Sequence, residues 1–231
     1  MFEGRLSLGQ GVNRFVNYAG GAFYGGLSLD LGNEESVLEN WGDFVLGELA
    51  TPDTAVLTGD LFLGDTGIWY SAIDFNDNTA DRIVVSGAAR VSGTIHFGLL
   101  NANKILPGVR SISLVEALKP TDSPLPLPEQ APSGHLASTA FGSSLGEVDL
   151  IFPDSLIMTH NISEDAGLFA FGYDLDFAAD WMTTSRQVVG EHFNSIQLNG
   201  SSDELAGVIV NLLFTDQEEV SIDEEFGRIT A

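Results

Sequence analysis

A serine between glycines is the first feature of the sequence that could do chemistry. Residues 142–146 read Gly-Ser-Ser-Leu-Gly, the Gly-x-Ser-x-Gly pattern in which a nucleophilic serine sits on a strained turn between a strand and a helix. His160 and His192 follow in the chain and are candidate bases for Ser144. Residues 147–152 read as a strand where the elbow needs a helix. We therefore predict an ordinary turn and keep a serine hydrolase as an alternative.

A cluster of oxygen-bearing side chains between residues 74 and 81 could bind a hard cation. The order Asp-x-Asn-x-Asn from residue 74 is that of the first ligands in a calcium loop. The sixth position is threonine where the sharp turn needs glycine, and the twelfth is valine where a bidentate glutamate is needed, so an EF-hand is excluded. A looser calcium site made by Asp74, Asn76, Asp77 and Asp81 stays open.

Other metal and catalytic chemistry finds little support in the residue types. The chain has no cysteine, which excludes disulfides and thiolate ligands. Its four histidines have no spacing suited to zinc: His96, His135, His160 and His192. His96 alternates with apolar neighbours and is expected to face solvent from a strand. Carboxylates are abundant, yet no pair has a spacing that predicts the two acids of a glycosidase. We expect no cofactor and no catalytic residue, with a carbohydrate-active enzyme as an alternative.

Composition limits the partners that the protein can have. Among 231 residues, 33 are acidic and 9 are basic, giving a formal net charge of −24, which repels nucleic acid and anionic membranes. A solvated acidic surface explains this excess, and cation binding by clustered carboxylates is the alternative. Hydrophobic residues make up 44% of the chain, enough to form a sizeable core. The first residues do not read as a signal peptide, and no apolar run is long enough to predict a transmembrane helix.

The N-terminal part of the chain carries a loose internal repeat. Residues 15–20 and 37–42 share the order aliphatic-x-Asn-aromatic, which places Asn17 and Asn40 23 residues apart. Repeats of 20–50 residues are typical of solenoids. In a parallel β-helix, an asparagine at a turn can hydrogen-bond its own backbone or its counterpart one coil away. Chance recurrence in a loop-rich β protein is the alternative explanation.

Alternation of apolar and polar residues predicts buried strands in the same region. One set of positions is expected to face the core: Leu6, Leu8, Leu27, Leu29, Leu31, Phe44, Leu46, Leu57, Leu61 and Leu63. The intervening set is expected to face outward: Ser7, Ser28, Asp30, Val45 and Phe62. Val45 and Phe62 are apolar, which fits an outer face that is stacked or covered. At about 23 residues per coil, residues 1–117 correspond to roughly five coils.

The stretch from residue 70 to residue 117 has a strand-turn-strand rhythm. Apolar runs at 83–85, 94–100 and 112–115 are separated by asparagine, glycine and proline turns. Residues 80–87 read Ala-Asp-Arg-Ile-Val-Val-Ser-Gly, and residues 91–94 read Val-Ser-Gly-Thr. This cadence resembles the C-terminal passenger region of bacterial autotransporters, the type V secreted proteins of the pertactin-like and adhesin kind.

The resemblance implies a mainly β fold, a right-handed parallel β-helix followed by a short C-terminal α-helical segment. It implies that residues 70–117 form the autochaperone segment within β-helical coils spanning residues 1–118. Asp81 and Arg82 would then fix a turn of this segment. The other structural residues of the motif would be Gly87, Gly93 and Thr94.

Beyond residue 118 the chain changes character three times. Residues 119–132 hold five of the eight prolines and are predicted to form a surface loop. Residues 133–180 return to a β pattern, with predicted strands at 147–152 and 167–175. Residues 181–231 are expected to form a helical linker with a solvated acidic tail at 216–225.

Two helices are predicted by apolar residues at helical spacing. The first places Gln187, Val188, Val189, His192, Phe193 and Ile196 on one face, and the second Leu205, Val208, Ile209, Leu212 and Leu213. Asn199-Gly200 breaks the two, and Ser201 with Glu204 forms a predicted capping box. The pair resembles the autotransporter linker, in which Gln187, Leu205 and Leu212 would be helix positions before the membrane barrel.

These features together predict a non-enzymatic protein. The resemblance implies a secreted or surface-exposed stem on a Gram-negative bacterium, whose partner is its own outer-membrane barrel, absent from this chain. Such a stem supports the folding, export and display of an upstream region, in adhesion or virulence. If so, the chain is an excised fragment. The alternative is an adhesin or carbohydrate-binding module for a host or matrix ligand, with an exposed aromatic patch near Tyr18, Tyr24 or Trp41.

Overall fold

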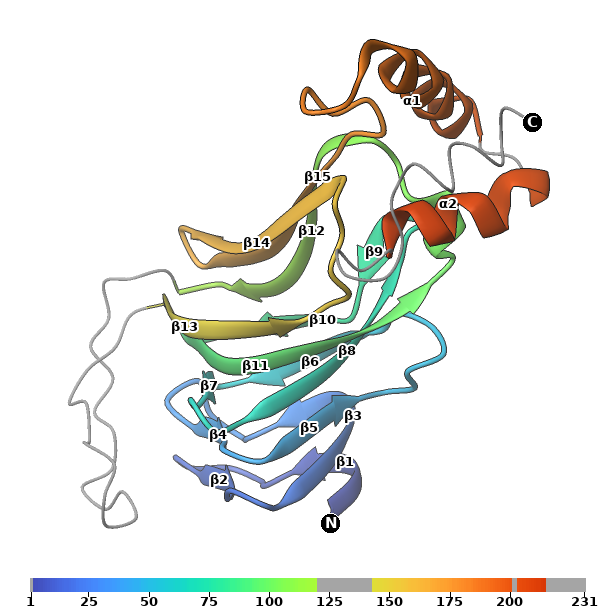
Figure 1. Ribbon diagram of the computed structural model, residues 1–231. Coiled ribbons are helices and arrows are strands. Elements are labelled where there is room, and N and C mark those ends of the chain that lie inside the picture. The colour runs from blue at the N-terminus through green and yellow to red at the C-terminus, as the bar shows by residue number, and fades with distance from the viewer. Residues whose placement is uncertain (1, 120–142, 201–202, 215–231) are drawn as a thin grey trace.

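The computed structural model describes residues 2–119, 143–200 and 203–214 (Figure 1). The fold is mainly β, as predicted, with one large and mostly parallel sheet and two α-helices. The strands are stacked from the N-terminus toward the C-terminal helices. The Pro-rich segment after Lys119, the first capping residue Ser201 and the acidic tail lie outside the described residues.

The elements follow one another in the chain with short connections. Twelve strands precede residue 119: β1 (Phe2–Ser7), β2 (Arg14–Asn17), β3 (Ala22–Asp30), β4 (Val37–Asn40), β5 (Asp43–Leu46), β6 (Thr54–Thr58), β7 (Asp60–Leu63), β8 (Ile68–Asp74), β9 (Thr79–Ala80), β10 (Arg82–Val85), β11 (Ala89–Leu100) and β12 (Gly108–Ala117). After residue 142 come β13 (Ser144–Ile151), β14 (Met158–Asp165), β15 (Leu168–Leu175), α1 (Thr184–Leu198) and α2 (Ala206–Leu213). Two 3₁₀ turns complete the set, η1 (Ala102–Lys104) and η2 (Asp203–Leu205).

Parallel pairing arranges these strands in three rows. Row 1 joins β2, β4, β7 and the start of β11. Row 2 joins the start of β3 to β5, β8, the end of β11 and then β13. Row 3 joins the end of β3 to β6, β10 and β12. Except at β13, parallel partners between β2 and β12 are 21 to 32 residues apart, from Phe23 with Phe44 to Ile83 with Val115, and the short β9 pairs antiparallel with β8.

Within each row, core-facing residues that are register partners on neighbouring strands have similar apolar side chains. In row 2, Phe23 pairs with Phe44 and Phe44 with Trp69, and all three side chains are at most 1% exposed. The Phe23 and Phe44 rings stack with their centroids 5.5 Å apart. Fully burying one such side chain is worth roughly 1.5–3 kcal/mol. The continuous core therefore runs along the rows, between the inward faces of the strands.

The C-terminal end departs from parallel pairing. β15 pairs antiparallel with β12 at the end of row 3, and β14 pairs antiparallel with β15 as a hairpin. Phe171 of β15 packs between Phe97 and Phe152, with ring centroids 4.9 and 5.3 Å away. Helix α2 adds Ile209, Leu212 and Leu213 to the same core. Row 3 is thus covered at this end by a hairpin.

The alternation prediction is confirmed at most positions. Eight of the ten predicted core positions are buried: Leu6, Leu29, Leu31, Phe44, Leu46, Leu57, Leu61 and Leu63. It is wrong for Leu8 and Leu27, which are 37% and 43% exposed. Leu8 follows the last residue of β1, and Leu27 lies where β3 passes from row 2 to row 3, so neither keeps the two-residue period of a straight strand. Val45 was expected to face outward and is only 7% exposed.

Candidate functional site

The residues singled out between 81 and 94 lie where strands of one row turn into the next. Asp81 precedes β10 and is fully buried. Its Oδ2 accepts the Ala72 N–H at 2.6 Å, and its Oδ1 accepts the Asp53 N–H at 2.7 Å. Burial raises the pKa of Asp81 to about 6, against the opposing effect of these two bonds. The carboxylate therefore joins the end of row 2 to the segment that enters β6.

Arg82 shares Asp53 as a partner with Asp81 through its backbone, since its N–H donates to the Asp53 carbonyl at 2.8 Å, but its side chain points to another strand. It lies in β10 and forms an ion pair with Glu116 of β12, its neighbour in row 3. Both side chains are 37% exposed, so the pair is open to solvent. Exposed pairs typically contribute less than about 1 kcal/mol. The side-chain bonds to backbone at this corner therefore come from the Asp81 carboxylate, and Arg82 adds one bond from its own backbone N–H.

The two predicted glycines lie where neighbouring strands touch. A Cβ on Gly87 would meet Oδ1 of Asp60 at 1.9 Å. Gly93 has φ +81, and a Cβ there would lie 2.4 Å from the carbonyl oxygen of Gly64. Thr94 follows at the start of the row 2 part of β11, and its N–H donates to the Gly67 carbonyl at 2.9 Å. Gly87 therefore lies against Gly59 and Asp60, whereas Gly93 and Thr94 lie against Gly64 and Gly67.

The predicted asparagine contact is present. Asn17 and Asn40 are register partners in row 1, and both are buried. The Asn17 amide donates to Oδ1 of Asn40 at 2.7 Å, and the Asn40 amide donates to the Gly42 carbonyl at 2.8 Å. The recurrence at 23 residues therefore marks a buried amide ladder at one corner.

A second buried polar corner, formed around Asp60, is not among the predicted sites. Asp60 is 1% exposed, and its Oδ1 accepts the Ala88 N–H at 2.7 Å, while Ser36 and Ser143 are buried at the same edge of row 1. Burial raises the pKa of Asp60 to about 6, with the Ala88 N–H and Lys119 acting in the opposite direction. The signal in the sequence was Gly59-Asp60 directly before an apolar strand, a turn glycine followed by an acid.

The two predicted helices are present, and the buried face of the first differs from the prediction. Helix α1 buries Gly190, Phe193 and Gln197, whereas Val188 is 62% exposed. His192 is exposed as well, so the predicted first face is wrong at these two positions. The α2 prediction holds for Ile209, Leu212 and Leu213, which are buried, while Leu205 is half-buried in η2.

Gln197, which the sequence reading missed, connects α1 to the strands. It is 1% exposed and donates through Nε2 to the carbonyl oxygens of Asn103 and Ile105, both at 2.9 Å. Gln187, the residue predicted from the resemblance, is half-buried and donates to the Ala179 carbonyl at 3.4 Å. The bonds of Gln197 are the shorter ones, and they reach the segment before β12.

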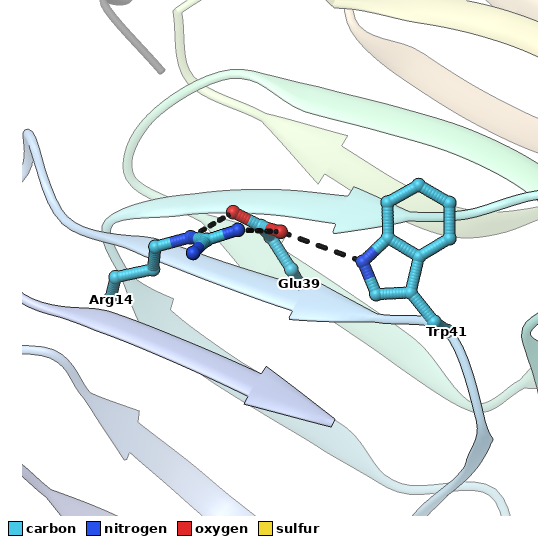
Figure 2. A network of polar contacts seen from close by, with 3 residues as sticks. All are labelled: Arg14, Glu39 and Trp41. Atoms are coloured by element: carbon cyan, nitrogen blue, oxygen red, sulfur yellow. Dashed lines mark hydrogen bonds and ion pairs between the residues drawn. The ribbon is translucent and has the colours of Figure 1, made fainter. Parts of the chain in front are cut away.

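Polar and aromatic side chains of row 1 form a cluster around Glu39. Arg14 makes two hydrogen bonds to Glu39, from Nε at 2.6 Å and from Nη2 at 2.8 Å. The Trp41 ring nitrogen donates to the same carboxylate at 3.5 Å (Figure 2). Phe62, the register partner of Glu39, packs on Trp41 at 5.0 Å, and Arg90 lies 5.9 Å above its ring. The hydrogen bond to Glu39 raises the pKa of Arg14.

The candidate nucleophile is not on an elbow. Ser144 is the first residue of β13 and pairs in parallel register with Arg90. An elbow needs a strand followed by a helix, and β13 runs on to Ile151. His160 lies in β14, where its ring packs on Phe152 at 4.9 Å, and burial lowers its pKa. His192 is an exposed residue of α1.

Three of the four calcium candidates are joined by hydrogen bonds, and the fourth, Asp81, is bonded elsewhere. Asp74 accepts the Asn76 N–H and the Asn101 amide, each at 2.8 Å, and Asn76 donates to Asp77. Asp81 is bonded to backbone amides elsewhere. No group of three or more His, Cys, Asp or Glu side chains suited to a metal occurs in the described part of the chain. Likewise, none of its helices is long and apolar enough to cross a membrane.

His96 occupies the expected strand position. It is half-buried on the outer side of β11, between the buried residues Ile95 and Phe97, and its ring lies 5.3 Å from that of Tyr70.

A scan against protein-family models and a search of the curated proteins found no match to the chain.

Proposed function

We propose that the chain is a non-enzymatic stem, a right-handed parallel β-helix with an autochaperone role in a secreted autotransporter passenger. In this proposal each set of three row segments is one coil, and β14, β15 and the two helices cover the C-terminal end. The stem supports folding and export of an upstream region at the surface of a Gram-negative bacterium. Its partner is an outer-membrane barrel.

One observation carries the proposal: consecutive strands visit row 1, row 2 and row 3 in turn, and each strand pairs in register with the strand of the previous visit. The buried corner residues Asn40, Asp60 and Asp81 reinforce this register. A finished coil therefore offers the next segment both hydrogen-bonding groups and matching apolar side chains. In quasi-one-dimensional proteins folding can nucleate at one place and propagate in this way.

The C-terminal end is the natural nucleus in this mechanism. There β12, β15 and β14 form an antiparallel unit that packs Phe97, Phe152 and Phe171 together. The β14–β15 contacts are close in sequence, so this hairpin forms with a smaller loop-closure cost than the parallel ladders do, and it then offers an edge to β12, whose partners in β15 are 52 to 67 residues away. The parallel rows would then be added toward β1, and the folding free energy would help to draw the chain outward.

Pulse-labelling hydrogen exchange during refolding tests this order. We expect amides of β11, β12 and β15 to become protected before those of β1 to β4, and far-UV circular dichroism to show mainly strand. Small-angle scattering should give an elongated particle. Early protection of β1 to β4, a mainly helical spectrum or a spherical scattering profile would contradict the proposal.

The second candidate function is ligand binding by an adhesin or carbohydrate-binding module. The observation in its favour is the aromatic content of the outer surface: Tyr18 is 56% exposed, Tyr24 is 38% exposed, and Trp41 packs on Phe62. Aromatic faces of this kind can stack on sugar rings. A glycan array probed with the protein and with a Tyr18→Ala, Tyr24→Ala variant tests it. Binding that needs both tyrosines would support this function, and an empty array would remove it.

A further inference from the structure

Two strands at the C-terminal end have an unpaired edge. Among the described residues, β13 is hydrogen-bonded only to β11, and β14 only to β15. Both strands lie at the end of the stack opposite to the N-terminus (Figure 1). A strand edge presents a line of N–H and C=O groups that can pair with another strand. We call the free edges of β13 and β14 the C-terminal edge.

Beside the C-terminal edge lie apolar side chains that are only partly covered. In β13, Leu145, Val148 and Leu150 pack against the core and are half-buried. Ile162 of β14 is in the same condition, and Ile151 is 49% exposed. An added strand whose alternate side chains are apolar would complete the cover over these residues. The geometry therefore favours an extended segment over a folded surface.

The exposed charged residues of the same strands are all acidic, and the other exposed positions are Ile151 in β13 and Thr159, Asn161 and Ser163 in β14. Glu147, Asp149 and Asp165 are exposed, and no lysine or arginine occurs between Lys119 and Arg186. Like charges placed opposite one another destabilise a strand pair. A second copy of this edge would bring acid against acid, so the C-terminal edge is built against pairing with itself. An incoming strand with lysine or arginine at its outward positions would meet opposite charges instead.

We propose that the C-terminal edge binds an extended segment of a partner protein in which apolar residues alternate with lysine or arginine. The partner adds a strand beside β13 or β14, places its apolar residues over Leu145, Val148 and Ile162, and pairs its basic residues with Glu147 and Asp149. This binding does not depend on an export role for the stem. The backbone ladder supplies affinity, and the acidic rim supplies the choice of partner.

The test uses the full chain and two labelled nine-residue peptides, one alternating valine with lysine and one alternating valine with glutamate. Fluorescence anisotropy in about 0.15 M salt, where charges more than about 8 Å apart are screened, measures their binding. The double variant Glu147→Lys, Asp149→Lys reverses the rim. The control Glu48→Lys, Asp65→Lys makes the same change of net charge at exposed acids outside the edge.

We expect the lysine peptide to bind the unaltered protein and the control alike, and to bind the rim variant about tenfold more weakly. The glutamate peptide should prefer the rim variant, and exchange protection on binding should appear in β13 and β14. Equal weakening by the control would show diffuse attraction to an acidic chain and overturn the proposal. So would the absence of binding, or a dimer in sedimentation that the rim variant abolishes, since the edge would then serve a second copy.

Discussion

Replacing Gly93 by alanine tests how closely the rows approach each other. Gly93 has φ +81, a conformation that costs an alanine about 1–2 kcal/mol. Its new Cβ would lie 2.4 Å from the Gly64 carbonyl oxygen and 2.6 Å from that of Gly67, both of them backbone atoms. Moving packed backbone apart to relieve such contacts costs about 1–3 kcal/mol. The expected loss of unfolding free energy is therefore about 2–5 kcal/mol.

The matched control is Gly98→Ala in the same strand, β11. Gly98 is exposed, and the nearest atom to its new Cβ would be the Ser71 carbonyl oxygen at 4.0 Å. The substitution removes the same freedom from the unfolded chain, an effect worth about 0.4–1 kcal/mol in favour of folding where the native conformation permits it. We expect the stability of this variant to stay within about 1 kcal/mol of the unaltered protein.

Urea unfolding followed by circular dichroism measures both variants. With a slope of about 2.5 kcal/mol/M, the Gly93→Ala midpoint should fall by about 1–2 M, while the Gly98→Ala midpoint should hardly move. A Gly93→Ala midpoint within about 0.3 M of the original would show that the rows are not in backbone contact at this corner. An equal loss of unfolding free energy in both variants would also refute the reasoning, because the effect would then not depend on the close backbone contacts of Gly93.

Three further predictions follow from buried polar groups. Gln197→Ala should lower the free energy of unfolding by about 2–3 kcal/mol and increase hydrogen exchange in α1. Gln187→Ala should lower it by less than about 1 kcal/mol, and equal effects of the two variants in urea unfolding would contradict this prediction. Burial raises the pKa of Asp60 to about 6, above the 3.8 of the free group. The contribution of Asp60 to the free energy of unfolding should therefore be highest below pH 4 and fall by about 1–2 kcal/mol as the pH rises to 7. Asp60→Asn should flatten that part of the stability profile, and an unchanged slope would refute it. Glu39→Gln should lower the free energy of unfolding by about 2–4 kcal/mol, because it removes the negative charge that Arg14 binds in a half-buried pair. Glu116→Gln, in an exposed pair, should lower it by less than about 1 kcal/mol in the same assay.

The features that the sequence predicted are those encoded by local pattern. Alternation predicted eight of the thirteen buried hydrophobic residues that the structure describes before residue 64, and helical spacing predicted both helices. The 23-residue recurrence predicted the pairing of Asn17 with Asn40, because a repeat brings equivalent residues into one register. The glycines at 87 and 93 were noticed as turn residues, and the structure shows the close contacts that require them.

The features that the sequence did not predict depend on contacts distant along the chain. Gln197 is buried because two carbonyl oxygens, 92 and 94 residues earlier, accept its amide. Nothing near Gln197 in the sequence indicates those partners. The β14–β15 hairpin was missed in part because strand patterns carry no sign of parallel or antiparallel pairing, and β14 itself mixes polar and apolar residues without a strong alternation.

The buried polar corners have a consequence for how the strands find their register. Rows of leucine, valine and phenylalanine tolerate a shift along the strand direction by two residues, because the same face stays apolar. A shift would leave the Asn17 amide without its acceptors on Asn40 and Asp43, and the Asp60 and Asp81 carboxylates without the N–H groups of Ala88 and Asp53, at a cost of about 1–3 kcal/mol for each group. Burial of the two acids opposes folding near neutral pH, as their raised pKa values show. The apolar rows thus stabilise the fold. The buried polar corners lower that stability, but they make the native register lower in free energy than registers shifted by two residues.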